Sequence, residues 1–558
     1  MRSVLNRSIH ALSALVLHRA DWRAMGWSGV AGAVLSAALL TLAFPKFDLF
    51  WLAWVALVPI FIATRNRSPR AAKWLWYLFG VLWIYGSVWW FSVTAYVNPL
   101  VIPGVVLMAL ILGLYVLLFG WGAVWLRRLG SVSLALIPMW WVVAVEFLRT
   151  ATELAFPWLY LAHTQHAQLA LIQSATVFGT HALSFLIVAG SLLLAEIVAL
   201  LRPPSAPKSW VPVITALVVW CVLMSLNAVL GAQALLRWAP PQSDQRISVA
   251  VVQPNWEQRD KILATDDDAM ADALFAQLLD QLAEVEPDSV DLVILPEAVV
   301  PEFEFPLEGK GRLQSLAAAA GQLNATVVFG AGRLEISPDL PPGQQPTLAD
   351  VRFYNSIYAL QPSAARSESP PFAVYDKIRL VPFSESAPLI SLIPGLMQLT
   401  LGQIALFTAG VEPNQLPVHG GALLGAHVCF ESTFPGLVRQ FAAGGAQILA
   451  TLTNDGWFLD SAGAPQHWIV QPFRAVENRR PIIQAANTGI SSVVHPTGAV
   501  IARSQVGERT TLRARVEPLH ATTVYTRHGD WAAQLFAALS LFGIAAAMRR
   551  RPLQERTD

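Results

Sequence analysis

Residues 423–431 read LLGAHVCFE, an apolar run that ends in Cys429 and an acidic residue. The run is typical of a buried strand, and its thiol is the only one in the large polar section of the chain. Two other strand-like runs of this section end in a charged side chain, at Glu297 and at Lys377. A cysteine, a glutamate and a lysine at the exits of separate strands can supply a nucleophile, its base and an electrostatic stabiliser.

Around these residues, strand-like and helix-like patterns alternate, which predicts an α/β domain. The section is long enough to bury one core. The predicted strands are Ile247–Val252, Leu292–Leu295, Ala325–Phe329, Phe353–Leu360, Leu424–Val428 and Ile448–Leu452, and the predicted helices are Asp266–Val285, Gly311–Leu323, Phe434–Ala443 and Gln466–Arg479.

The rest of the chain is strongly apolar. Of 558 residues, 54% are hydrophobic and only 13% charged, and the mean hydropathy is +0.48. Soluble proteins carry roughly a quarter charged residues, so the composition indicates a membrane protein. Runs long enough to approach a bilayer span of about 20 residues are Trp27–Phe44, Phe50–Thr64, Trp74–Ala95, Val101–Leu126, Val132–Leu148, Leu169–Leu201, Trp210–Leu236 and Trp531–Met548.

Lysines and arginines gather in alternate loops between these runs, which predicts that those loops and both termini are cytoplasmic. The polar section then lies in the periplasm of a bacterium, and the protein in its inner membrane. We predict seven transmembrane helices over residues 1–241, a periplasmic catalytic domain over 242–529, and a transmembrane helix with a basic tail over 530–558. The first run is expected to stay as an uncleaved anchor.

Charge and cysteine content exclude several kinds of partner. The formal net charge is +1 and no basic stripe is present, so nucleic acid is not expected as a partner. Cys221 and Cys429 lie in different environments, so we expect no disulfide between them. No spacing of cysteine and histidine resembles a metal site, and we expect neither a metal nor another cofactor.

Each site residue also has a structural interpretation. A buried free cysteine such as Cys429 is often a small core residue. Glu297 could cap a helix, and Lys377 could be a solvated lysine. Glu385 and Glu431 could be salt-bridge partners. Their joint occurrence in specific local contexts favours a catalytic site.

Those contexts resemble the glutamate, lysine and cysteine segments of the nitrilase superfamily: LPE at 295–297, YDKIRLVPFSE at 375–385 and VCFE at 428–431. With the membrane runs added, the chain resembles the apolipoprotein N-acyltransferase family over nearly its whole length. Further matching segments are VQPN at 252–255, TNDGWF at 453–458, QH at 466–467, NTGI at 487–490 and FPWL at 156–159. The resemblance implies a four-layer αββα nitrilase-like sandwich on a polytopic α-helical membrane domain of about eight spans.

The resemblance also implies the reaction. Cys429 would take an acyl chain from a phospholipid, expected to be phosphatidylethanolamine, as a thioester. The α-amino group of the diacylglyceryl-modified N-terminal cysteine of an apolipoprotein would then receive the chain. In this scheme Glu297 is the base and Lys377 stabilises the oxyanion.

Four further residues are predicted to bind substrate or to support the triad. Glu385 is expected to position substrate or the triad, and Glu431 to orient the nucleophile loop. Trp158, in an outward membrane loop, would contact acyl chains or act as an interfacial anchor. Phe430 stands where many family members have tyrosine, so it keeps the ring and loses the hydroxyl.

Two points stay open. A tryptophan expected from the family falls at Ile262 by counting, and the nearby Trp256 either replaces it or does not. The apolar segment Pro388–Phe407 follows Glu385 closely. It is expected to be a mobile arm that dips into the membrane interface, with a buried helix or strand pair as the alternative.

Two other functions fit parts of the sequence. A membrane-tethered nitrilase-type amidase would use the same triad with water as the final acceptor. A transporter with an extracytoplasmic domain would need ionisable groups within its spans, and the apolar runs hold few of them.

Overall fold

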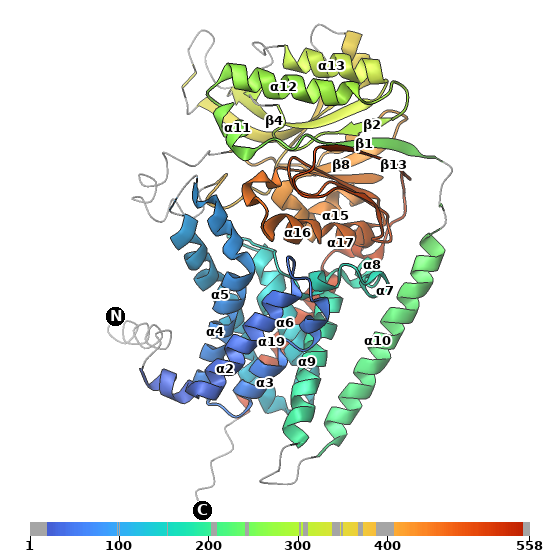
Figure 1. Ribbon diagram of the computed structural model, residues 1–558. Helices are drawn as coiled ribbons and strands as arrows, with labels where there is room; N and C mark the ends of the chain where they lie inside the picture. Colours follow the sequence, from blue (N-terminus) through green and yellow to red (C-terminus); the bar gives the residue numbers. More distant parts are fainter. Residues whose placement is uncertain are drawn as a thin grey trace, which may run out of the picture.

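A computed structural model describes the chain from residue 19 to residue 550, with gaps. The residues outside the description within this range are 97–98, 100, 153, 202–208, 240, 242–244, 301–302, 305–310, 337–345, 348–349, 367–371 and 387–406. The molecule is elongated, with a bundle of helices at one end and a domain of two stacked sheets at the other (Figure 1).

The outer sheet has seven strands and lies far from the helical bundle (Figure 1). Its order is β13 (Thr510–Val516), β1 (Ile247–Gln253), β2 (Leu292–Ile294), β4 (Thr326–Ile336), β5 (Val351–Leu360) and β6 (Phe372–Asp376), and β3 (Phe303–Glu304) also pairs with β4. Strands β1, β2 and β4 are parallel, which puts their carboxyl ends at one edge.

The inner sheet has six strands. Its order is β12 (Val500–Arg503), β11 (Ser492–Val494), β10 (Ile482–Ala486), β9 (Ile448–Thr453), β8 (Leu423–Val428) and β7 (Leu416–Pro417). Strands β8, β9 and β10 are parallel and buried along almost their whole length, as near-continuous apolar runs predict.

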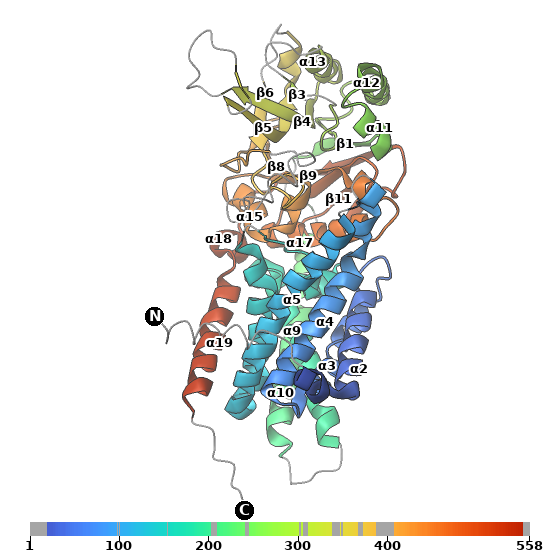
Figure 2. The same ribbon diagram turned by 90° about the vertical axis from the view of Figure 1, so that its left-hand side faces the viewer.

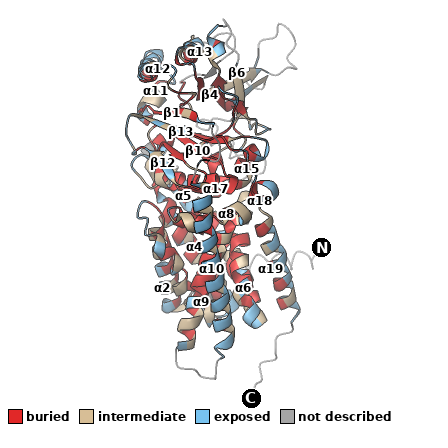
Figure 3. Ribbon diagram, turned by 90° about the vertical axis from the view of Figure 1, so that its right-hand side faces the viewer, coloured by how far each residue is buried: buried red, intermediate tan, exposed pale blue. Residues whose placement is uncertain are grey.

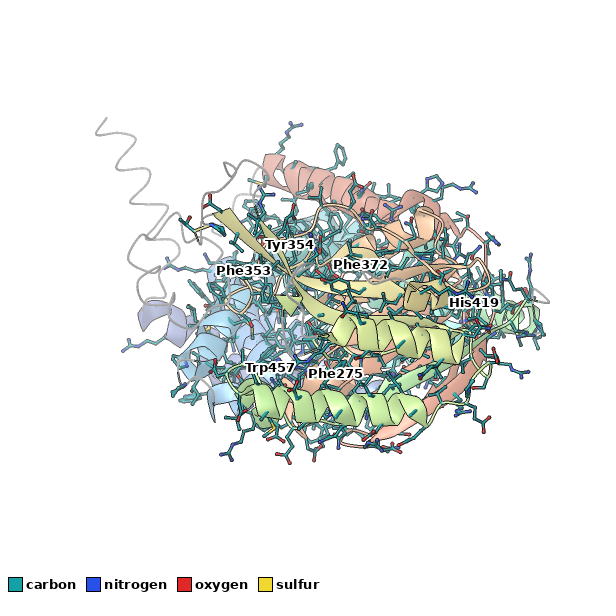
Figure 4. All side chains as sticks on the ribbon, turned by 90° about the horizontal axis from the view of Figure 1, so that it is seen from above. Phe275, Phe353, Tyr354, Phe372, His419 and Trp457 are labelled. Carbon is teal, nitrogen blue, oxygen red and sulfur yellow. The ribbon has the colours of Figure 1, made fainter. Side chains whose placement is uncertain are left out.

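Helices cover both outer faces of the two sheets. Helices α12 (Asp268–Ala283) and α13 (Arg312–Leu323) lie side by side over the outer sheet (Figures 1 and 4). Helices α15 (Pro435–Ala443), α16 (Gly463–Trp468) and α17 (Gln471–Asn478) lie between the inner sheet and the bundle (Figure 1). The predicted αββα sandwich is confirmed. The single helix predicted over Gln466–Arg479 is wrong, because the structure breaks it between α16 and α17.

Within the described residues, six helical segments are long and apolar enough to cross a membrane. They are Arg23–Ala43 in α2 (Arg19–Ala43), Pro69–Thr94 in and beyond α4 (Pro69–Val88), Val101–Thr150, which joins α5 (Val101–Leu126) to α6 (Ser133–Trp141), then α9 (His181–Leu201), α10 (Val211–Trp238) and α19 (Trp531–Arg549). The 50-residue segment contains the fourth and fifth predicted runs.

Two predicted runs differ from continuous spans. The second forms a short 3-10 turn, Phe50–Trp54, followed by α3 (Val58–Arg65). The sixth begins with the short helices α7 (Leu169–Ile172) and α8 (Ala175–Phe178), which lie at the junction with the sheet domain before α9 starts (Figure 1). Helix α10 stands at the edge of the bundle (Figure 1) and is mostly exposed (Figure 3).

One glutamine side chain joins the helical bundle to the sheet domain. The indole N–H groups of Trp90 and Trp158 donate to Gln466 Oε1 over 3.1 and 3.0 Å. The Gln466 amide donates in turn to the carbonyl oxygens of Pro45, at 2.8 Å, and Ser87, at 3.0 Å. Gln466 is buried, so these four bonds hold α16 against three separate membrane segments.

Candidate active site

The structure brings the predicted glutamate and lysine together, although they follow strands that are not adjacent in the outer sheet. Glu297 follows β2, and Lys377 follows β6. Lys377 Nζ lies 2.7 Å from Glu385 Oε1 and 3.5 Å from Glu297 Oε1. The Asn355 side chain donates to both glutamates, over 2.8 and 3.1 Å. One buried lysine and one amide therefore hold two carboxylates in a fixed arrangement.

Backbone contacts fix the position of Glu297. Its Oε2 accepts the Asn454 N–H over 2.9 Å. Strand β4 passes so close behind it that a Cβ on Gly330 would lie 2.6 Å from Glu297 Cα. Lys261 Nζ donates to the Glu297 carbonyl oxygen at the limiting distance of 3.5 Å, and burial lowers the pKa of Lys261 to about 8.

The charges around the thiol favour a neutral cysteine beside a charged lysine. Burial disfavours the charge of Lys377, but the Glu385 and Glu297 carboxylates outweigh it and raise the pKa of Lys377. Burial and the Glu297 carboxylate raise the pKa of the Cys429 thiol well above its ordinary value, against the effect of Lys377. A thiol with a raised pKa is neutral, and it would need a base to take its proton before it could act as a nucleophile.

Cys429 itself is held in an uncommon backbone conformation. It begins a 3-10 turn, Cys429–Thr433, directly after β8, with φ at +48°. The residue as a whole is partly accessible, whereas the neighbouring Phe430, Glu431 and Ser432 are buried. A positive φ is costly for a residue with a side chain, so neighbouring contacts must maintain it.

Glu431 supplies one set of those contacts. The side chain is fully buried and accepts four hydrogen bonds. Oε1 accepts from Tyr375 OH, Ile378 N and Arg379 N over 2.8, 2.7 and 2.9 Å, and Oε2 accepts from Val428 N over 2.8 Å. This carboxylate therefore connects the loop after the lysine to the strand before the cysteine.

His467 supplies a second set. Its Nδ1 lies 2.9 Å from Asp455 Oδ1, and its Nε2 lies 3.0 Å from the Cys429 carbonyl oxygen and 2.9 Å from Ser432 Oγ. The Trp158 ring stacks on the imidazole with centroids 5.5 Å apart. Burial opposes protonation, but Asp455 and the Cys429 carbonyl outweigh it and raise the pKa of His467.

The same residues are the one metal-like cluster within the described part of the chain. Ligand atoms of Cys429, Asp455 and His467 lie within 4.8 Å of one another. However, both nitrogens of the imidazole already face hydrogen-bond partners, and the carboxylate oxygen nearest to it is one of them. The arrangement fits a hydrogen-bonded support for the turn Cys429–Thr433 better than a metal centre.

The aromatic residues predicted beside the site are buried at the junction. Phe430 packs against Phe156 and Phe434, with ring centroids 6.1 and 5.1 Å apart. Trp158 is 5% exposed, so it lies between the bundle and the sheet domain rather than on the outer surface. Phe458, at the end of the segment that carries Asp455, packs against the Trp90 ring at 4.7 Å.

The two open points have different outcomes. Trp256 is buried and exchanges hydrogen bonds with Asn487, whereas Ile262 is 36% exposed. Trp256 is therefore part of the core. The segment Pro388–Phe407 lies outside the described residues except for Phe407, whose N–H donates to the Glu385 carbonyl oxygen over 3.0 Å.

Sequence reasoning gave no role to Asn355, Asn454, Asp455 or His467. Asn454 and Asp455 follow a buried strand, as the predicted triad residues do, so the same signal could have found them. Asn355 lies inside a predicted strand, and His467 within a matching segment, but no local pattern shows what either contacts.

Two protein-family models match this chain. "Apolipoprotein N-acyltransferase N-terminal domain" matches residues 36–193, and "Carbon-nitrogen hydrolase" matches residues 248–523. The apolipoprotein N-acyltransferase of Geobacter metallireducens is 30% identical over 538 residues, which cover 94% of this chain and 96% of the relative.

The chain belongs to the apolipoprotein N-acyltransferase family. Members from Azotobacter vinelandii and Pasteurella multocida are 29% and 27% identical, each over 94% of this chain and 96% of their own. Among solved structures, an amidase from Nesterenkonia sp. is 19% identical with a TM-score of 0.34, over 54% of this chain and 98% of its own. The predicted membership of the apolipoprotein N-acyltransferase family is thus confirmed.

Proposed function

We propose that the protein is a phospholipid:apolipoprotein N-acyltransferase, which transfers an acyl chain through a Cys429 thioester to the α-amino group of a lipoprotein's diacylglyceryl-cysteine. One observation carries the proposal: the match to the acyltransferase family covers 94% of the chain, including both the membrane helices and the sheet domain. An amidase that releases its product to water has no need of the membrane part.

In the first half-reaction, Cys429 Sγ attacks the ester carbonyl of the phospholipid while Glu297 takes the thiol proton. Lys377 Nζ stabilises the negative charge that develops on the carbonyl oxygen. The lysophospholipid oxygen then leaves with the proton held by Glu297, and the acyl chain stays on sulfur as a thioester. The raised pKa of the Cys429 thiol supports this order, because a neutral thiol needs a base within the site.

In the second half-reaction, the amine of the acceptor attacks the thioester carbonyl. Glu297 takes a proton from the amine and returns it to the departing sulfur, and an amide bond replaces the thioester. Water must be kept from the acyl-enzyme meanwhile. The buried aromatic rings of Phe156, Trp158 and Phe430 beside the nucleophile turn support such exclusion.

Other residues would position the reacting groups. Glu385 would hold the lysine through the 2.7 Å ion pair, and Glu431 would align the lysine loop with the nucleophile strand. Phe430 and Trp158 would line the acyl path at the junction. Phosphatidylethanolamine would be the donor, because it is the donor that the family resemblance implies.

The membrane topology follows the distribution of basic loops. Residues 1–241 would form the membrane domain, 242–529 the periplasmic catalytic domain, and 530–558 the last span and a cytoplasmic tail. The protein would lie in the bacterial inner membrane. Membrane anchoring would let the donor's acyl chain stay in lipid, which avoids about 0.8 kcal/mol for each exposed CH₂ group.

A chase experiment tests the proposal. Acyl-enzyme is formed with phosphatidylethanolamine, separated from excess lipid, and mixed with a diacylglyceryl lipopeptide or with buffer alone. We expect the thioester to persist in buffer and to pass to the peptide amine. Rapid loss of the thioester in buffer, with release of free fatty acid and no acylated peptide, would instead establish a hydrolase.

A further inference from the structure

The membrane face opposite the sheet domain has a cavity lined by arginines. Its volume is about 190 Å³, and Arg65, Arg67, Arg127 and Arg128 line it together with apolar groups from α4 and α5. Arg65 ends α3 and Arg67 lies just beyond it, while Arg127 and Arg128 follow α5, and both helices end at the bottom of the bundle (Figure 2). The cavity is therefore remote from the proposed nucleophile.

Among the described residues, positive charge exceeds negative charge around this cavity. Arg65 pairs with Glu196, and Arg127 lies 3.8 Å from the same carboxylate. Arg67 donates to the Ala24 carbonyl oxygen and to Ser28 Oγ, both of which are uncharged. Arg128 lies over the Trp125 ring at 4.2 Å. In the described part of the chain, four guanidinium groups line the cavity and one carboxylate pairs with two of them, which suits an anionic ligand.

A second, larger cavity of about 830 Å³ adjoins the first, and Arg67 lines both. Its walls are mainly apolar side chains of α2, α3 and α9, including Leu39, Ile62 and Val198. On α2 it extends from Ser28 to Leu39, which is about 16 Å at 1.5 Å per residue. The polar groups that line it, such as Asn66, lie at the end shared with the arginine cavity.

We propose that these two cavities bind one anionic phospholipid, with its phosphate among the arginines and its acyl chains in the groove between α2, α3 and α9. Basic pockets between membrane helices recognise lipid head groups in this way. A free anion would fill the first cavity and leave the apolar groove unused. The bound lipid would hold α2, α3 and α9 together and would not be the acyl donor, because it lies at the far end of the bundle from β8, the strand that Cys429 follows (Figure 2).

Basic residues on this face are also expected from the preference for lysine and arginine in cytoplasmic loops, with no bound lipid. The test therefore needs a control variant that removes a charge outside the cavities. Arg70 is exposed on the same face and lies outside the residues that line either cavity. Arg70→Gln therefore removes an equivalent charge without changing the proposed site. Val198→Trp fills the groove and leaves every arginine in place, and Val219→Trp on the exposed face of α10 is its control.

The experiment is native mass spectrometry of the delipidated full-length protein, titrated with dioleoyl phosphatidylglycerol, dioleoyl phosphatidylcholine or inorganic phosphate. We expect one phosphatidylglycerol per protein, bound at least about tenfold more tightly than phosphatidylcholine. The double variant Arg127→Gln with Arg128→Gln should weaken binding about 25-fold, at about fivefold per arginine. Val198→Trp should weaken it too, whereas both controls should bind as the wild type does.

Equal affinity for the two lipids would overturn the proposal, as would unchanged phosphatidylglycerol binding in the double variant or in Val198→Trp. Inorganic phosphate that binds as tightly as phosphatidylglycerol would show an anion site without a lipid. If the double variant does not fold, the comparison of lipids on the wild type and the Val198→Trp titration still decide. Thioester formation at Cys429 should be retained in Val198→Trp, which separates this inference from the proposed function.

Discussion

Gly330→Ala tests the position of Glu297 most strictly, because the substitution alters no chemical group of the proposed triad. The added Cβ would lie 2.6 Å from Glu297 Cα and 2.7 Å from the Ala298 nitrogen. Ordinary contact between carbon atoms begins near 3.5 Å, so the two segments must separate by about 1 Å. Backbone bonds from Gly330 to Pro296 and from Val299 to Gly330, at 3.0 and 2.9 Å, oppose that separation.

The expected result is a displaced Glu297. A misplacement of about 1 Å at a reacting group can cost about 10²-fold in rate, and overpacking costs about 1–3 kcal/mol of stability. Rapid-quench single-turnover acylation, followed by intact mass, measures the rate, and thermal unfolding checks the fold. Gly436→Ala is the control, since its Cβ would meet nothing closer than an oxygen at 3.6 Å. Wild-type acylation kinetics in a folded Gly330→Ala protein would refute the reasoning.

Three further predictions concern charged groups of the site. Glu297→Gln and Lys377→Ala should each slow thioester formation by about 10²-fold or more, and near-normal single-turnover acylation of a folded variant would remove that residue from the mechanism. The two carboxylate oxygens of Glu431 accept four buried hydrogen bonds, and Glu431→Gln replaces one of these oxygens with an N–H donor. The free energy of unfolding should therefore fall by about 3 kcal/mol. An unchanged denaturant midpoint would contradict this role. The pKa of His467 is raised from 6.5, so its stabilisation is complete below that pH and is lost as pH rises through the raised value. The stability difference between the wild type and His467→Gln should therefore shrink as the pH rises above 6.5, and a constant difference would show that the imidazole charge contributes nothing.

The sequence pattern was sufficient to predict an α/β domain and the convergence of Glu297 and Lys377, and the family resemblance implied the four-layer sandwich. Parallel strands bring their carboxyl ends to one edge of a sheet. Reactive side chains that directly follow predicted strands can therefore be recognised in the sequence as members of one site. Hydropathy likewise located the membrane segments. Hydropathy did not show the break at Gly179, before α9 begins. The short helices α7 and α8, at the junction between the bundle and the sheet domain, are as apolar as part of a membrane span.

The support of the site could not be predicted in this way. Asn355 bridges two glutamates that are 58 and 30 residues away in sequence, and Gln466 reaches Trp90 across 376 residues. Such bonds depend on tertiary packing and leave no periodic signal. The requirement for glycine at position 330 could not be predicted either, because it arises from the close approach of the Glu297 backbone.

The thioester on Cys429 is the central claim, and intact mass of the purified protein after incubation with phosphatidylethanolamine tests it most directly. We predict one added acyl chain, removable with hydroxylamine, on the wild type and on Cys221→Ala, whose thiol is exposed on α10. Cys429→Ala should carry no such chain and should transfer none. A hydroxylamine-sensitive acyl adduct that persists on Cys429→Ala would contradict the account.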